Sequence, residues 1–302
     1  MPRHARRDGG RPGTVLAAAV FVALVVAGCQ ASGYVYRWDF FFDSIFRPDS
    51  LIIRGVGLTL FIAVISQTVG VILGVFGALG KMAKATPFRI IAGFYVWFFR
   101  GTPLLVQIAL VYFGLGVTGI YGWPEITPLG AFGKGAVQAG IVALGVNEGA
   151  YMSEIVRAGI LSIDPGQMEA AKSLGMTFGQ SMRRIILPQA ARVIVPPLGN
   201  EFNNMLKTTS LLVVISVPEL YVTFSYKNAS GPMTFHPFEL FLAAAVWYLL
   251  LTTIWGLIQA RIERRLAKGT AGSVSAGPSL RERLFRGGRA PADELPAITG
   301  GR

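Results

Sequence analysis

Long apolar spans with few charges dominate this sequence and limit the folds that it can adopt. Of its 302 residues, 52% are hydrophobic and only 15% are charged, whereas a soluble domain usually carries about 25% charged residues. A helix needs roughly 20 predominantly apolar residues to cross the hydrocarbon of a bilayer. The composition and the spans therefore predict an all-α integral membrane protein, a polytopic helix bundle.

About six stretches are long enough to be transmembrane helices. The fifth contains Pro196, Pro197 and Pro218, so we expect it to be broken or kinked. Small residues such as Gly70 and Gly74 favour close helix packing in lipid, and we interpret them as packing residues. The predicted spans cover residues 14–32, 53–79, 89–116, 134–156, 193–222 and 239–260.

Lysine and arginine are concentrated in alternate loops, which predicts the orientation of the spans. They precede the first span, lie between the second and third and between the fourth and fifth, and follow the sixth. Because cytoplasmic loops carry the excess of cations, both termini and residues 157–192 are predicted to be cytoplasmic. This reading makes the chain a multi-pass protein of a plasma membrane.

The two ends of the chain fall outside the main block of spans. Residues 1–49 hold a basic tail, the first span and an outer loop, and residues 263–302 are Gly/Ser/Pro/Arg-rich and predicted to be disordered. Val26–Cys29 also resembles the lipid-accepting site of a lipoprotein signal. We favour a first transmembrane helix, because one spanning helix holds a protein more firmly than acyl chains do.

Several function classes are disfavoured by composition. The net charge of +12 comes from cations at span ends, so the membrane accounts for it and nucleic acid is not an expected partner. One cysteine and two histidines make a metal site of soft ligands improbable. No G-x-x-x-x-G-K-[ST] phosphate loop is present, so the chain is not itself an ATPase. We identify no catalytic residues and expect no cofactor bound by the chain.

The polar segment 160–188 predicts two short helices, of which the first begins after Asp164. Asp164 is a good N-cap, Pro165 suits the first helical position, and Gln167 stands where a capping-box partner belongs. We expect this helix to reach about Leu174 and to end at a left-handed Gly175.

The second helix of this segment should begin after Thr177. Thr177 and Gln180 have capping-box spacing. The helix should then run from Phe178 to Leu187 and stop before Pro188, because the residue before a proline avoids helical geometry.

Spaced motifs over residues 50–262 carry a family resemblance. The loop has the pattern E-A-A-x₃-G-x₉-I-x-L-P, and it is preceded by RGTPLLVQ at Arg100–Gln107 and by AY-x-x-E-I-x-R-x-G-I within Asn147–Ile160. It is followed by PQA and K-x-TSL blocks. Together these resemble the polar amino acid subfamily of binding-protein-dependent ABC importer permeases. Thr208 stands where that family usually has Asp, which leaves the role of that carboxylate open. The loop residues matched are Glu169, Ala170, Ala171, Gly175, Ile185, Leu187 and Pro188.

The resemblance implies a five-helix type I permease core at residues 50–262, with one extra N-terminal helix. It implies a dimer with an identical or paralogous permease, two cytoplasmic ATPase subunits, and an extracytoplasmic solute-binding protein that delivers an amino acid. ATP would act through the partner ATPase. The ATPase-coupling residues would be Glu169, Ala170, Ala171, Gly175, Leu187 and Pro188.

Polar residues inside the spans are costly in lipid, so they are either functional or paired. Broken helices near the membrane midplane expose groups that bind polar solutes. We predict that the translocation path is lined by Asn147, Glu148, Asn200, Glu201, Asn204 and Arg100. The alternative is that these residues clamp helices together, with Glu201 paired to Lys207 or Arg100.

A secondary transporter driven by an ion gradient remains the rival interpretation of the spans and buried charges. It would share the intramembrane charges, but it would have no use for the coupling loop. The sequence does not separate cationic, acidic and amide amino acids as solutes.

Overall fold

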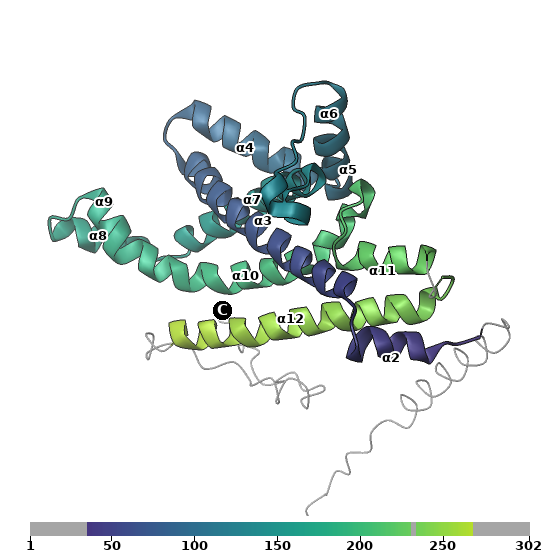
Figure 1. The fold of residues 1–302 in the computed structure, drawn as a ribbon. Coiled ribbons are helices and arrows are strands. Elements are labelled where there is room, and N and C mark those ends of the chain that lie inside the picture. The colour runs from purple at the N-terminus through teal and green to yellow at the C-terminus, as the bar shows by residue number, and fades with distance from the viewer. Residues whose placement is uncertain (1–34, 231–233, 268–302) are drawn as a thin grey trace, which may run out of the picture.

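The computed structural model describes residues 35–230 and 234–267, which form helices joined by turns, with no strand among them (Figure 1). The predicted all-helical fold is confirmed. The predicted first span, Cys29 and the residues after 267 lie outside the described residues.

The most extensive helix–helix packing in the bundle is between α3 (Ser50–Met82) and α7 (Gly135–Leu161). Asp49 begins α3 by accepting a hydrogen bond from the Ile52 N–H at 3.0 Å. α7 is enclosed by its neighbours for most of its length. These two helices therefore form the framework on which the other elements are placed.

Glycines allow α3 and α7 to approach closely. A Cβ atom on Gly70 would lie 2.5 Å from Glu148 Cγ, and one on Gly74 would overlap Met152 Cβ. No larger residue fits at these points without moving a helix. The interpretation of these glycines as packing residues is confirmed.

A sharp bend of 107° separates α4 (Thr86–Gly101) from the following helical run. That run consists of α5 (Leu104–Ala109), the π-helical turn η1 (Leu110–Gly114) and α6 (Leu115–Val117). The prediction of one span over 89–116 is therefore wrong as a straight helix. The Gly-Thr-Pro sequence ends α4, because the residue before a proline takes extended geometry.

The fifth predicted span is also broken, as expected. It consists of α10 (Leu187–Thr208), the 3₁₀ turn η4 (Thr209–Ile215) and α11 (Leu220–Ala229), with a bend of 47°. Pro196 and Pro197 do not cause the break, because they lie inside α10. The helix ends only at η4.

The outer surface of the bundle is completed by α12 (Pro237–Ala267) and the short α2 (Trp38–Phe46). The indole N–H of Trp247 donates to the Ser44 carbonyl at 3.0 Å and so fixes α2 on α12. Trp255 donates in the same way to α10. α12 is thus tied through its middle turns to both α2 and α10.

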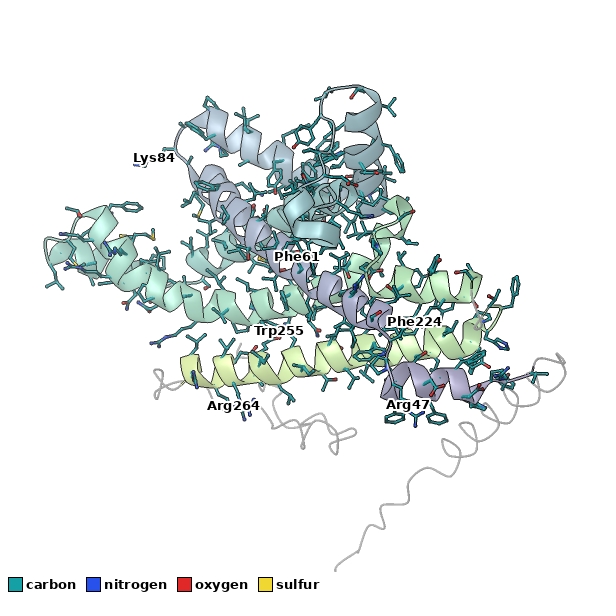
Figure 2. The ribbon with its side chains drawn as sticks, in the orientation of Figure 1. Arg47, Phe61, Lys84, Phe224, Trp255 and Arg264 are labelled. Carbon is teal, nitrogen blue, oxygen red and sulfur yellow. The ribbon has the colours of Figure 1, made fainter. Side chains whose placement is uncertain are left out.

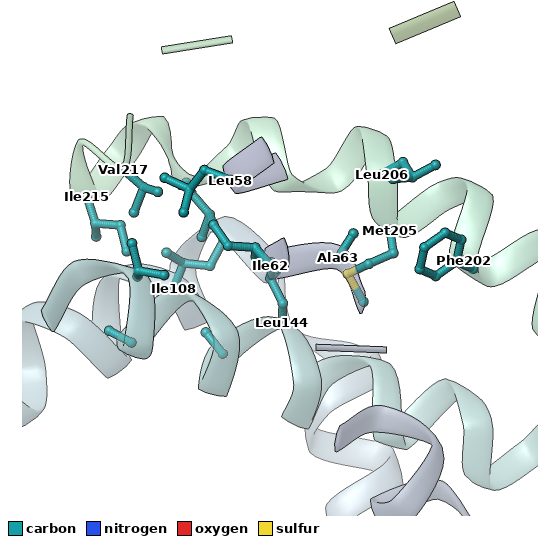
Figure 3. Packing of buried hydrophobic residues seen from close by; sticks show 14 residues of the cluster. Leu58, Ile62, Ala63, Ile108, Leu144, Phe202, Met205, Leu206, Ile215 and Val217 are labelled. Carbon is teal, nitrogen blue, oxygen red and sulfur yellow. The ribbon is translucent and has the colours of Figure 1, made fainter. Parts of the chain in front are cut away.

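The main hydrophobic core lies where α3, α5, α7 and α10 meet (Figure 3). Its side chains interlock around the kinked segments, so the bends are held by packing as well as by hydrogen bonds. The labelled members of this cluster are Leu58, Ile62, Ala63, Ile108, Leu144, Phe202, Met205, Leu206, Ile215 and Val217.

Two helices of the described residues, α3 and residues 237–266, are long and apolar enough to cross a membrane alone. Each bent pair would add one more span. The helix expected over 134–156 is present as α7. α7 is not among the helices that are apolar enough to cross a membrane alone. It is the helix most enclosed by protein, so its polar residues can be kept away from lipid.

The two ends of the bundle differ. At one end, α8 (Pro165–Ser173) and α9 (Phe178–Ser181) project away from the helices, on the left of Figure 1, whereas α2 and α11 lie on the right. Lys84 and Arg264 lie toward the end with α8 and α9 (Figure 2).

Candidate functional site

The break between α4 and α5 leaves backbone carbonyls that side-chain amides satisfy. Pro103 has no N–H, so it cannot donate to the Phe99 carbonyl four residues earlier. That carbonyl instead accepts from Gln107 Nε2 at 2.9 Å and from Asn147 Nδ2 at 3.0 Å. Gln107 also donates to the Thr102 hydroxyl oxygen at 2.7 Å. The bend is therefore locked onto α7.

A cavity of about 500 Å³ lies beside this bend, between α5, α7 and the end of α10. Its wall is predominantly polar and holds two carboxylates and one ammonium group. The lining residues are Thr102, Leu104, Leu144, Asn147, Glu148, Tyr151, Glu201, Asn204, Met205, Lys207 and Thr208.

Four of the six predicted translocation residues meet in this cavity: Asn147, Glu148, Glu201 and Asn204. They come from α7 and α10, which are separated in the sequence by the whole coupling loop. Their convergence was expected from the sequence, although their use in transport stays a prediction.

The other two predicted residues do not line the cavity. The side-chain Oδ1 of Asn200 accepts a hydrogen bond from Gln259 Nε2 at 3.1 Å, so Asn200 clamps α10 to α12. The Arg100 guanidinium lies over the Tyr151 ring, 5.2 Å from its centroid. For Asn200, the contact agrees with the alternative that these polar residues hold helices together.

The two cavity carboxylates have different surroundings. Glu148 is buried, and its Oε1 accepts from Gln67 Nε2 at 3.1 Å. Glu201 forms no hydrogen bond or ion pair with any described residue, so the suggested pairing with Lys207 or Arg100 does not occur there. Both carboxylates line the same cavity.

Asn147 serves the fold and the cavity together. Its two amide hydrogens are both used, by the Phe99 carbonyl and by Gln107 Oε1, each at 3.0 Å. A solute can therefore reach only its carbonyl oxygen.

Sequence reasoning did not place Thr102, Tyr151 or Lys207 in the path. Lys207 carries the only cationic side chain in the described lining of the cavity. Helical spacing could have placed Lys207 in the path, because Lys207 and Asn204 lie three residues apart on α10 and so share a face.

An ion-pair cluster ties α7 to α3 at the end that leads to the coupling loop. Glu154 pairs with Lys81 of α3 through one oxygen and with Arg157 through the other, at 2.8 Å for the second pair. All three groups are partly buried, so they are less screened than surface pairs. The start of the coupling loop is thereby held in position relative to α3.

The first coupling helix ends in the motif that its sequence predicted. The Asp164 side chain accepts from the Gly166 N–H at 2.8 Å. At the other end, Gly175 has φ +76° and its N–H donates to the Lys172 carbonyl, while the Met176 N–H donates to the Ala171 carbonyl. This pair of bonds is the Schellman termination.

One detail of that helix differs from expectation. Gln167 does not complete a capping box, because its side-chain oxygen accepts instead from Gln189 Nε2 at 3.4 Å. This contact folds α8 back against the start of α10.

The second coupling helix begins as predicted and ends differently. Thr177 and Gln180 form the capping box, with bonds of 2.9 and 3.3 Å. The helix does not stop before Pro188. α9 passes into the π-helical turn η3 (Met182–Ile186) and then directly into α10, where Pro188 lies in the first turn, a position that tolerates proline.

The exposed side chains of the coupling loop include some of the motif residues and two apolar residues that the motif did not suggest. Ala171 is only 1% exposed and packs within the loop, whereas Glu169 and Ala170 face solvent. Leu174 is 81% exposed and Phe178 is 64% exposed, one on each side of Gly175. These two large apolar residues stand at the tip of the loop, and the sequence reasoning missed them.

Comparison with known proteins identifies the family. The model of the binding-protein-dependent transport system inner membrane component matches residues 70–268. The chain belongs to this family. It is therefore a permease component of a membrane transporter, and an ion-gradient-driven secondary transporter is set aside.

Individual relatives agree with this assignment. The permease is 38% identical to the arginine transport system permease protein ArgU of Corynebacterium glutamicum over 88% of this chain and 84% of that protein. It is 39% identical to the arginine transport system permease protein ArtQ of Bacillus subtilis, over 71% of this chain and 92% of that one.

Solved structures support the fold of the permease. A crystal structure of an amino acid ABC transporter with histidines matches with a TM-score of 0.65 and 39% identity, over 74% of this chain and 98% of that one. An inward-facing MetNI methionine ABC transporter matches with a TM-score of 0.57 at 19% identity, which supports the fold alone.

Proposed function

We propose that this permease translocates amino acids in an ATP-driven importer and that cationic amino acids are its preferred solutes. The observation that carries the proposal is the cavity in which Glu148 and Glu201 face one Lys207. The carboxylates outnumber the cation in the described lining. A cationic solute would supply the opposite charge that the carboxylates lack there.

The chemistry of a free amino acid matches the cavity groups. The carboxylates suit the α-ammonium group and a basic side chain, and Lys207 suits the α-carboxylate. The arginine permeases among the relatives are consistent with this preference. Solute selection would be shared with an extracytoplasmic binding protein.

The first prediction concerns the two carboxylates. Glu148→Gln and Glu201→Gln should each lower ATP-driven arginine uptake about tenfold or more, because a hydrogen bond to a charged group contributes about 1.5–3 kcal/mol. Uptake of radiolabelled arginine into proteoliposomes that contain the complete transporter measures this effect.

Glu125→Gln is the matched control, because Glu125 is an exposed carboxylate outside the cavity lining. It should transport as the unmodified protein does. Full uptake by both cavity variants, at normal membrane levels, would remove the two carboxylates from the path. A larger loss for glutamine than for arginine would overturn the cationic preference.

The coupling loop is the proposed point of contact with the ATPase that supplies the energy for transport. We infer that two ATPase subunits dock on the loops of this permease and of a second, identical or paralogous, copy. The chain itself binds no cofactor, and ATP acts through the ATPase. With both termini in the cytoplasm, ATPase closure would move the loops and drive alternating access of the cavity by rigid-body motion.

The second prediction concerns the tip of the loop. Leu174→Ser and Phe178→Ser should each weaken binding of the ATPase about thirtyfold or more, because large apolar anchors in a partner pocket contribute about 2 kcal/mol or more. Their high exposure means that the change removes little from the fold of the loop.

Phe88→Ser is the control for this pair. Phe88 is 64% exposed, as Phe178 is, and it lies on α4 outside the loop. ATPase retention measured by mass spectrometry should be unchanged in Phe88→Ser. Equal retention in all three variants would show that the apolar tip is not the docking anchor.

A further inference from the structure

A second cavity lies at the end of α3 opposite the coupling loop. It has a volume of about 590 Å³ and is bordered by α3, by the 3₁₀ turn η2 (Thr127–Gly133) and by the start of α11. Its wall is mainly apolar, with Leu51, Leu58 and Phe132 among its members. Phe132 is fixed there by an edge contact with Phe61 at a centroid distance of 5.0 Å.

Arg54 is the charged residue of this cavity. It forms no ion pair or hydrogen bond with any other described residue. The carboxylate one turn away, Asp49, is already engaged by Lys227. Burial alone would raise the pKa of Asp49, but the Lys227 and Ile52 hydrogen bonds outweigh it and lower that pKa. Within residues 35–230 and 234–267, Arg54 therefore has no counter-ion.

The position of Arg54 along α3 matches the depth of lipid phosphates. The helix has 33 residues and is about 50 Å long at 1.5 Å per residue. The hydrocarbon core is only about 30 Å thick, so the first turns of α3 extend into the headgroup region. Arg54 lies one turn inside the Asp49 cap, within that region.

The cavity wall has a charged part and an apolar part, arranged as the two parts of an amphiphilic ligand would require. Leu51, Arg54 and Leu58 recur at three- and four-residue spacing along one face of α3. The cation lies at headgroup depth, and Leu58 continues the wall one turn deeper. A molecule with an anionic head and a hydrocarbon tail would satisfy both parts.

We propose that this cavity binds an anionic glycerophospholipid, with its phosphate on the Arg54 guanidinium and an acyl chain against Leu58 and Phe132. A guanidinium recognises phosphate oxygens in bidentate geometry. The bound lipid would link α3 to η2 and α11, and so couple the bilayer to the broken helix beside the translocation cavity.

Native mass spectrometry of the complete transporter, titrated with phosphatidylglycerol, tests the proposal. Arg54→Gln should weaken lipid binding about tenfold. Arg47→Gln, which removes an exposed cation of the same end of the bundle but outside the cavity, should bind as the unmodified protein does (Figure 2). Ala131→Trp should also weaken binding, because it fills the cavity and leaves Arg54 in place.

Three results would overturn the proposal. These are undiminished phosphatidylglycerol binding by both Arg54→Gln and Ala131→Trp, equal binding of phosphatidylcholine, or an oxidative cross-link between two copies through Ala131→Cys in a Cys29→Ser background. The last result would mean that the cavity is an interface between copies. None of these outcomes depends on the nature of the transported solute.

Discussion

Gly74→Val should prevent the permease from folding into a stable bundle. A Cβ on Gly74 would overlap Met152 Cβ and lie within 3.1 Å of the Met152 Cα, so α3 and α7 would have to separate. Overpacking typically costs about 1–3 kcal/mol and occasionally more, and here it falls on backbone atoms at the contact that organises the bundle. We expect loss of the monodisperse peak in detergent and a melting temperature too low to measure.

Gly57→Val on the same helix is the control for this prediction. A Cβ on Gly57 meets nothing within 4 Å. This variant should therefore purify and melt as the unmodified protein does, with only the small effect of a β-branched residue on helix propensity. If Gly74→Val gave a normal yield and melting temperature, the close approach of α3 and α7 would be wrong.

Local rules predicted the parts of the fold that depend on neighbouring residues. The Thr177–Gln180 capping box and the left-handed Gly175 are present as expected, because each needs only residues within one helical turn. The end of the second coupling helix was not predicted. A π turn before Pro188 depends on how α9 and α10 pack, and the sequence pattern does not show it.

Long-range contacts decided which polar residues reach the cavity. Asn200 and Asn204 lie four residues apart, so helical periodicity places both on nearly the same face. Asn200 nevertheless bonds to Gln259 of α12, whereas Asn204 lines the cavity. Only the position of α12 separates the two, and no local pattern specifies that position.

One buried carboxylate gave no signal at all in the sequence. Glu219 lies at the start of α11 and is fully buried. It accepts hydrogen bonds from the Tyr248 hydroxyl at 2.7 Å, the Thr59 hydroxyl at 3.2 Å and the Val222 N–H at 2.9 Å. Its partners are spread over α3, α11 and α12, so its structural role follows from the tertiary fold alone.

Gly175→Val should disconnect the permease from its energy source while the bundle stays folded. Gly175 has φ +76°, a region that a β-branched residue enters only with strain of about 1–3 kcal/mol. The strain falls on the Schellman termination, whose two hydrogen bonds fix the angle between α8 and α9. A change in that angle would alter how the exposed Leu174 and Phe178 are presented to a partner. We expect ATP-driven uptake to fall at least tenfold and ATPase co-purification to fall with it.

Gly179→Val tests whether the effect belongs to the backbone conformation. Gly179 lies in the same loop, a Cβ there meets nothing within 4 Å, and its φ is not positive. Its uptake and ATPase retention should stay near normal. The melting temperature of Gly175→Val should also stay near normal, because the strained turn is exposed and remote from the α3–α7 contact. Full uptake with Gly175→Val would contradict the coupling role of the turn, whereas a collapse of its melting temperature would show that the turn supports the fold instead.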